Sequence, residues 1–114
     1  MAVNFNIGID AGSTFQVIFA WKDAASEAID MTGYSARMQL RMDLGQANPD
    51  LSLATGSGIT ITAADGEILV EIEPATTETM TGSYFYDLEV ESPTGVVTRL
   101  CQGTVTVSSE VTRE

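Results

Sequence analysis

The sequence predicts an all-β fold, a single antiparallel β-sandwich of seven to eight short strands. Hydrophobic residues alternate with polar ones along most of the chain, which is the pattern of half-buried strands. Turn-forming residues recur about every eight to twelve positions, and no long stretch has the 3.6-residue period of a helix. Since neither an internal repeat nor a linker interrupts the pattern, we expect residues 1–114 to form one domain.

The composition narrows the classes of partner. The chain has sixteen acidic and five basic residues, a net charge of −11 that repels phosphate, so we expect no binding to nucleic acid or to an anionic membrane. Its single cysteine, Cys101, cannot form an intramolecular disulfide, which suits a reducing compartment. The first residues include no basic segment and no long apolar segment, so we expect no signal peptide.

The first half of the chain is expected to contain three strands and one long loop. The strands cover residues 4–9, 14–22 and 34–43, and the loop covers residues 44–58 with a short edge strand at 51–54. On the second strand the residues that share the inner face are Phe15, Val17, Phe19 and Trp21, and on the third they are Ala36, Met38, Leu40 and Met42. We therefore place Trp21 in the core.

The second half is expected to contain two hairpins. Strands at 59–62 and 68–72 are joined by a turn at 64–67, and Pro74 ends the return strand before a helical turn within 75–81. The last two strands, 82–91 and 96–108, are joined by a turn at 92–95. The first of them carries inward Tyr84, Tyr86, Leu88 and Val90, and outward Phe85, Asp87, Glu89 and Glu91.

One irregularity predicts a β-bulge in the final strand. Val96, Thr98 and Leu100 share one parity, whereas Val105 and Val107 have the other. A regular strand cannot bury both sets, so we expect the bulge at Gln102–Gly103, where Gly103 allows the required backbone geometry.

The search for chemistry indicates a protein that is not an enzyme. The chain has no histidine, so the commonest general base and zinc ligand are both missing, and Cys101 has no imidazole to activate it. The carboxylates of Asp87, Glu89 and Glu91 stand in a row on one strand face, with arginines as natural cross-strand partners. A solvated face with ion pairs is the better interpretation, so we expect no catalytic residues, no cofactor and no metal.

Exposed apolar residues on an acidic sheet face are what a protein–protein contact needs. Phe85 lies among carboxylates, while Ile18 and Leu69 break the polar parity of their strands. We therefore predict an interface made of Phe85, Asp87, Glu89, Ile18 and Leu69.

The segment Gly82-Ser83-Tyr84-Phe85-Tyr86 resembles the entry to the sixth strand of immunoglobulin-like sandwiches. The resemblance implies that the predicted sandwich is immunoglobulin-like and that Tyr84, preceded by Gly82, is its corner tyrosine. It also implies that Tyr86 takes the position usually held by a cysteine, so the disulfide of that fold is not carried over.

A longer resemblance covers nearly the whole chain. The residues that carry it are 14–23, 29–39, 82–90, 97–100 and 103–108. They are similar to a family of small β-sandwich proteins of tailed bacteriophages. Members of that family resemble the amino-terminal sandwich of upper baseplate proteins. The resemblance implies a virion structural protein, made in the host cytoplasm, that decorates or joins parts of the capsid, neck, tail or baseplate. Its partners would be other virion proteins, with many copies in a symmetric assembly.

A second function stays open at this point. The long loop at residues 44–58 is a candidate binding loop, so a carbohydrate or host-receptor binding β-sandwich module is the alternative to the virion structural protein.

Overall fold

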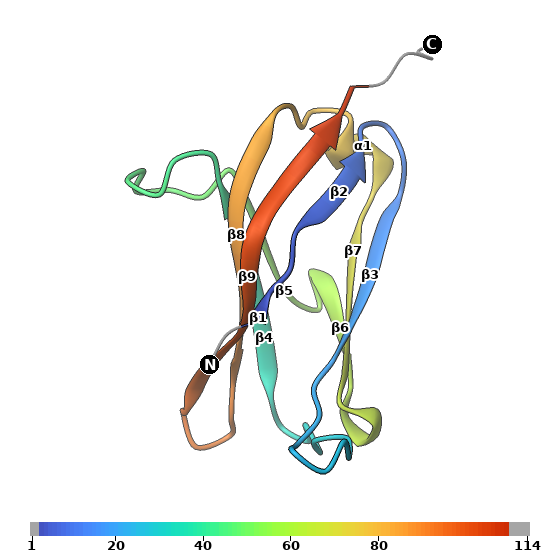
Figure 1. Cartoon of the computed structure of the whole chain (residues 1–114), viewed down its shortest axis with the longest axis vertical. Helices are drawn as coiled ribbons and strands as arrows, with labels where there is room; N and C mark the ends of the chain where they lie inside the picture. The colour runs from blue at the N-terminus through green and yellow to red at the C-terminus, as the bar shows by residue number, and fades with distance from the viewer. Residues whose placement is uncertain (1–2, 110–114) are drawn as a thin grey trace.

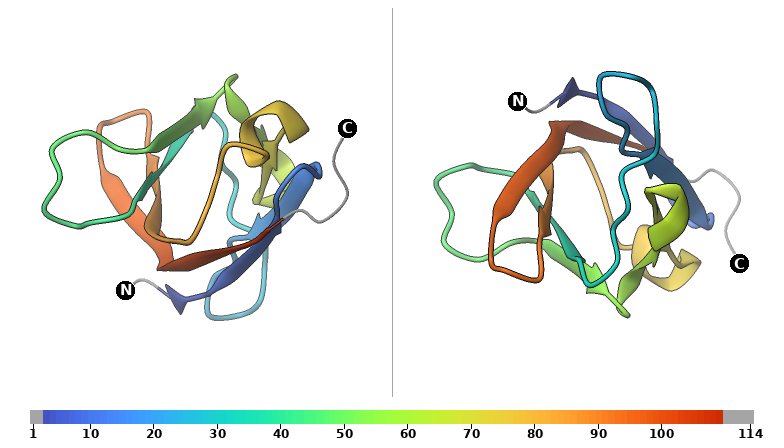
Figure 2. Two further views of the ribbon diagram at one scale, coloured as in Figure 1. Left: turned by 90° about the horizontal axis from the view of Figure 1, so that it is seen from above. Right: turned by 90° about the horizontal axis from the view of Figure 1, so that it is seen from below.

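The computed structural model describes residues 3–109, which form a β-sheet folded into two layers that pack face to face (Figures 1 and 2). The strands are β1 (Val3–Asn4), β2 (Ile7–Asp10), β3 (Phe15–Ala20), β4 (Ser35–Arg41), β5 (Leu51–Thr55), β6 (Gly58–Thr62), β7 (Glu67–Ile72), β8 (Ser83–Glu91) and β9 (Val97–Ser108). A 3₁₀ turn, η1 (Ala63–Asp65), joins β6 to β7, and a short helix, α1 (Pro74–Thr77), follows β7. Residues 1–2 and 110–114 of the predicted domain lie outside the described part.

The strand order is that of an immunoglobulin-like sandwich. The hydrogen-bonded path β1-β9-β8-β4-β5-β6-β7-β3 folds over on itself into two layers, with β2 beside β9. One layer contains the antiparallel set β4-β8-β9 and the parallel pair β2-β9, and the other contains β6-β7-β3. Two parallel residue pairs between β5 and β6 join the layers on one side. The predicted fold class is therefore confirmed by the topology.

The core lies between the layers and follows the predicted alternation. The buried side chains of the two central strands are Ala36, Met38 and Leu40 of β4, and Tyr84, Tyr86, Leu88 and Val90 of β8. The inward side chains of β3 and Trp21 just after it are only partly buried, because β3 lies at the end of its layer. The prediction for Met42 is wrong: it is 45% exposed, since β4 ends at Arg41 and the chain turns outward.

Tyr84 makes the contact that a tyrosine corner requires. The phenol is buried, and its hydroxyl accepts a hydrogen bond from the backbone N–H of Thr81 at 3.2 Å. Gly82, between them, has a φ of 76°, a left-handed conformation that residues with a Cβ rarely adopt. Its carbonyl accepts a bond from the N–H of Val107 at 2.9 Å, which ties the corner to β9.

The predicted bulge exists, but its predicted position is wrong. Leu88 pairs with Cys101, whereas the next residue, Glu89, pairs with Arg99, so the extra residue is Leu100. Gly103 pairs regularly with Tyr86. The parity of β9 must change before Cys101 because that side chain is already buried in the core.

Gly103 is required for a different reason, the close approach of the N-terminal segment. The single strand predicted at residues 4–9 is split into β1 and β2, and Phe5 and Asn6 cross β9 between them. A Cβ on Gly103 would collide with the Phe5 carbonyl oxygen and lie 2.9 Å from Oδ1 of Asn6. The Phe5 carbonyl in turn accepts a 2.5 Å hydrogen bond from the hydroxyl of Tyr86.

We predict that Gly103→Ala destabilises the protein by about 1–3 kcal/mol, because the new methyl group forces the N-terminal segment away from β9. Gly8→Ala is the matched control: Gly8 lies in β2, and a Cβ there would meet no atom within 4 Å. Urea unfolding of both variants measures the difference. Equal stability of the two variants would contradict this role for Gly103.

Candidate functional site

The candidate site is the outer face of β4, β8 and β9, which we call the docking face. The register places Arg37 opposite Glu89 and Arg41 opposite Phe85 across β4 and β8. The docking face consists of Arg37, Gln39, Arg41, Phe85, Asp87, Glu89, Glu91, Arg99, Gln102 and Thr104. These residues come from three neighbouring antiparallel strands, so the sheet itself fixes their spacing.

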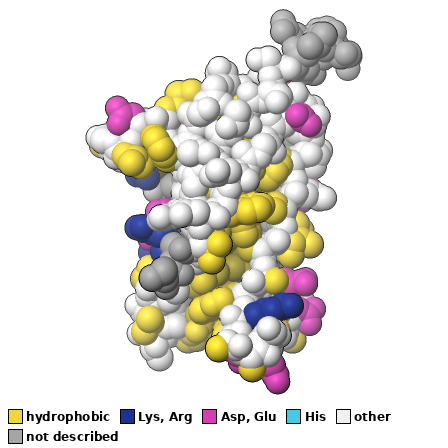
Figure 3. All heavy atoms as spheres, in the orientation of Figure 1, with side chains coloured by type: hydrophobic (Ala, Val, Ile, Leu, Met, Phe, Trp, Pro, Cys, Tyr) yellow, Lys and Arg dark blue, Asp and Glu magenta, His cyan; other side chains and the backbone are white. Residues whose placement is uncertain are grey.

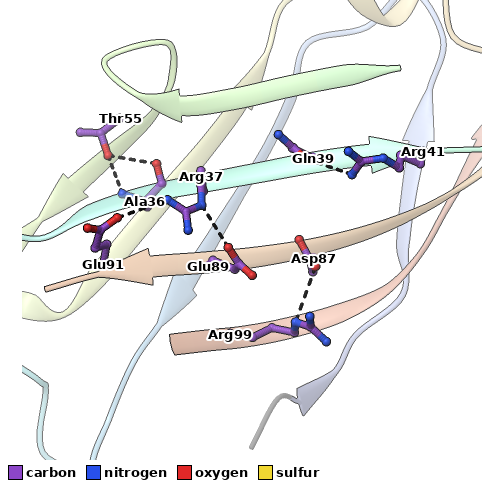
Figure 4. A network of polar contacts seen from close by, with 9 residues as sticks. All are labelled: Ala36, Arg37, Gln39, Arg41, Thr55, Asp87, Glu89, Glu91 and Arg99. Carbon is purple, nitrogen blue, oxygen red and sulfur yellow. Dashed lines mark hydrogen bonds and ion pairs between the residues drawn. The ribbon is translucent and has the colours of Figure 1, made fainter. Parts of the chain in front are cut away.

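Ion pairs connect the three strands (Figure 4). Nε of Arg37 lies 3.0 Å from Oε1 of Glu89, and its Nη1 lies 3.3 Å from Oε1 of Glu91. Nε of Arg99 lies 3.5 Å from Oδ2 of Asp87. Exposed pairs of this kind contribute little to stability, usually about 0–1 kcal/mol each.

The docking face is therefore electrically neutral rather than acidic, which corrects the sequence-based prediction. Its three carboxylates are matched by three arginines, Arg37, Arg41 and Arg99. The whole net charge of −11 consequently belongs to the rest of the chain. The expected ion pairs with arginines are found, at Arg37 and Arg99, and only the description of the face as acidic is corrected.

Asp87 occupies an unfavourable position for a carboxylate. Burial raises its pKa above the ordinary value of 3.8, and the nearby charge of Glu89 raises it further, while Arg99, Arg41 and Arg37 only partly offset this. The guanidinium of Arg37 has a raised pKa, chiefly because of its hydrogen bond to Glu89. The charge of Arg37 is thus stabilised by its partner, whereas Asp87 keeps its charge at a cost.

A groove of about 660 Å³ opens on the docking face. Its lining includes Phe85, Asp87, Asn6, Gln102 and the side chain of Leu44. Phe85 is 42% exposed and Leu44 is 72% exposed, so the groove offers an apolar surface next to amide and charged groups.

The loop between β4 and β5, which carries Leu44, projects from the sandwich beside β8 (Figure 1). Its own hydrogen bonds hold its shape. The N–H of Met42 donates to Oδ2 of Asp50 at 2.7 Å, and Nε2 of Gln46 donates to the carbonyl of Asn48 at 2.7 Å. One wall of the groove is therefore a loop that is braced internally.

The structure separates the predicted interface residues into two groups. Phe85, Asp87 and Glu89 lie together on the docking face. Ile18 and Leu69 face each other across β3 and β7 in the opposite layer, away from Phe85. Sequence reasoning did not find the groove residues Asn4, Asn6, Leu44 and Gln102. The packing of the N-terminal segment and the β4–β5 loop brings the first three to Phe85, and the pairing of β9 with β8 places Gln102 opposite Asp87.

Cys101, the nucleophile considered in the sequence, is part of the hydrophobic core. Cys101 is buried, its pKa is raised by that burial, and its Sγ lies 3.8 Å from the Tyr86 hydroxyl oxygen, whose proton is donated to the Phe5 carbonyl. Within residues 3–109, no group of three or more His, Cys, Asp or Glu side chains is placed to hold a metal ion. In the same range no helix has the length and apolar character to cross a membrane.

We predict that Asp87→Asn leaves stability at pH 7 unchanged or raises it by about 0.5 kcal/mol, because the partly exposed carboxylate is screened by water. The folded state has the higher pKa, so the contribution of Asp87 to stability falls as pH rises from 3.8 to the raised folded value. The difference from wild type should therefore shrink on acidification. Urea unfolding at both ends of this pH range tests the prediction.

Glu89→Gln is the control on the same face. It removes the charge from a 3.0 Å bond to Arg37, so stability at pH 7 should fall by about 0.5–1 kcal/mol. A larger loss for Asp87→Asn than for Glu89→Gln would show that the Asp87 charge is stabilising.

Comparison with known proteins leaves the family open. The chain matches no protein-family model and no curated protein. Among solved structures, a chain titled Tim-1 superposes with a TM-score of 0.49 over 100% of both chains, at 14% sequence identity. The fold class described above rests on strand order and register, independently of this likeness.

Proposed function

We propose that the chain is a non-enzymatic structural module of a tailed-bacteriophage virion, which decorates or joins parts of the capsid, neck, tail or baseplate through its docking face. The observation that carries the proposal is a neutral, groove-bearing face with an exposed Phe85 on a chain of net charge −11. The resemblance to small phage sandwich proteins, carried by residues 14–23, 29–39, 82–90, 97–100 and 103–108, supports the same function.

The docking face has the chemistry of a protein interface. Phe85, at the end of the face where β4 stops, serves as an aromatic anchor, and the charged groups of Arg41, Asp87 and Arg99 line the same groove. Because the charges of this face are balanced, even an acidic partner can approach it without the repulsion that the rest of the chain would impose.

The groove next to Phe85 gives the contact its shape. A loop or side chain of another virion protein would rest against Phe85 and Leu44, with Asn6 and Gln102 in reach for hydrogen bonds. Asp87, which keeps its charge against the preference of its surroundings, is then explained by binding, since residues that cost stability are typical of functional surfaces.

A carbohydrate or host-receptor binding module is the second candidate, and the lining of the groove favours it. Asn4, Asn6, Gln39 and Gln102 supply amide groups beside the ring of Phe85. A few placed polar groups next to an aromatic surface are the usual lining of a small-ligand site.

We predict that Phe85→Lys leaves the fold intact and lowers incorporation of the protein into particles by at least about tenfold, the effect of losing about 1.4 kcal/mol of a hot-spot contact. Ser83→Lys is the control, because Ser83 is exposed on the same face of β8 but does not line the groove. Quantitative mass spectrometry of purified particles measures copy number for both variants. Equal incorporation would remove Phe85 from the interface.

The two candidates differ in two readouts. A fixed copy number in purified wild-type particles, with no sugar bound on a glycan array, supports the structural module. Specific sugar binding that Phe85→Lys abolishes and Ser83→Lys preserves supports the second candidate. Absence of the protein from particles would overturn the virion proposal.

A further inference from the structure

The layer opposite the docking face ends in an unprotected strand edge. β3 pairs with β7 on one side, and among residues 3–109 no strand pairs with its other side. Natural sheets protect such edges with charges, prolines, bulges or very short strands. β3 has none of these: it has six residues, and no charged residue occurs between Ala11 and Trp21.

The edge at the other end of the strand path is better protected than β3. There the edge is formed by β1 and β2, which have only two and four residues. The segment at Phe5 and Asn6 interrupts their ladder, and Asp10 adds a charge. Short, interrupted edges are poor templates for another strand, so β3 is the edge that invites pairing.

The hydrogen-bond pattern between β3 and β7 determines which backbone groups of β3 point away from β7. The N–H of Trp21 donates to the carbonyl of Gly66 at 2.8 Å, just beyond the paired residues Ala20 and Glu67. Hydrogen-bonded positions alternate along an antiparallel strand, so Phe15, Val17 and Phe19 direct their backbone groups to β7. The backbone groups of Gln16, Ile18 and Ala20 therefore face the open edge.

An apolar seam runs beside this edge, between β3 and the N-terminal segment. The rings of Phe5 and Phe19 meet edge to face across it, with centroids 5.9 Å apart, and Phe5 is 46% exposed. Val17 is also only partly buried there. Figure 3 shows hydrophobic side chains gathered in the middle of this view of the molecule.

We propose that two copies of this chain associate through β3, which pairs with β3 of the second copy in an antiparallel, two-fold arrangement centred on Ile18. The six-stranded sheet that results runs β6-β7-β3 in one copy and continues through β3-β7-β6 of the other. Its geometry is isologous, so each copy uses the same surface.

In this register the outward backbone groups form hydrogen bonds, and the facing side chains are uncharged. With the axis at Ile18, Gln16 of one copy lies opposite Ala20 of the other, so every outward backbone group meets a complementary one. Ile18, which is 59% exposed in the single chain, lies opposite its own counterpart. No charged residues oppose each other within the paired segment.

The self-complementary register about Ile18 selects a second copy as the occupant, and the absence of charge along β3 permits it. A chain of net charge −11 repels its own copies at most angles of approach, but the uncharged stretch from Ala11 to Trp21 lets two copies meet at this edge. The seams of the two copies then face each other, which covers the exposed ring of Phe5. The inference is independent of the virion proposal, because it concerns the other layer and is tested on the purified chain.

The first test is the mass of the chain in solution. Sedimentation velocity over a concentration series should show the mass rising from 12.1 kDa to twice that value. Ile18→Lys places two ammonium groups across the axis and should keep the chain monomeric. Thr60→Lys is the control, because Thr60 is exposed on β6 in the same layer, away from the edge, and should dimerise as wild type does. A monomeric wild type at every concentration would overturn the proposal and leave the edge to a strand of a different protein.

The second test fixes the register. Across the axis the two Cα atoms of residue 18 should be about 5.5 Å apart, within the range of a disulfide. Ile18→Cys should therefore form a covalent dimer under mild oxidation at least about tenfold faster than Thr60→Cys, a difference equivalent to about 1.4 kcal/mol. Both variants retain the buried Cys101. Equal rates would exclude this pairing even if a dimer forms.

Discussion

The two-residue alternation of β8 is the constraint on which both the core and the docking face depend. One side of this strand buries Tyr84, Tyr86, Leu88 and Val90, and the other presents Phe85, Asp87, Glu89 and Glu91. A slip of one residue would bury carboxylates and expose Leu88, at a cost of several kcal/mol per buried charge. The packing of the core therefore fixes the positions of the groups on the docking face.

The bulge in β9 extends this constraint to a third strand. Arg99 and Gln102 are three positions apart, so in a regular strand they would point to opposite faces. The extra residue, Leu100, brings both to the docking face, where Nη1 of Arg99 donates to Oε1 of Gln102 at 3.1 Å. Gly103 then leaves room for the backbone of Phe5 and for Asn6, and Asn6 lines the groove.

The sequence was sufficient for features that depend on local patterns. Alternation predicted the strands and the inward face of β8, and Pro74 at the first position of α1 marks the end of β7. Parity required a bulge in β9 but led to the wrong position, Gln102–Gly103 instead of Leu100, because Gly103 had a second explanation in the close approach of the N-terminal segment. The neutral charge of the docking face and the groove depend on which strands are neighbours, which alternation within one strand does not determine.

The distribution of charge links the two proposed contacts. The docking face has balanced charges, and β3 has none, whereas the rest of the chain carries the net charge of −11. Like-charge repulsion therefore opposes association through other surfaces and leaves these two available. Because they lie on opposite layers, pairing through β3 leaves both docking faces of a dimer free. A two-fold pair of such modules would then present two identical faces, which is the arrangement that a symmetric assembly can use to connect neighbouring subunits.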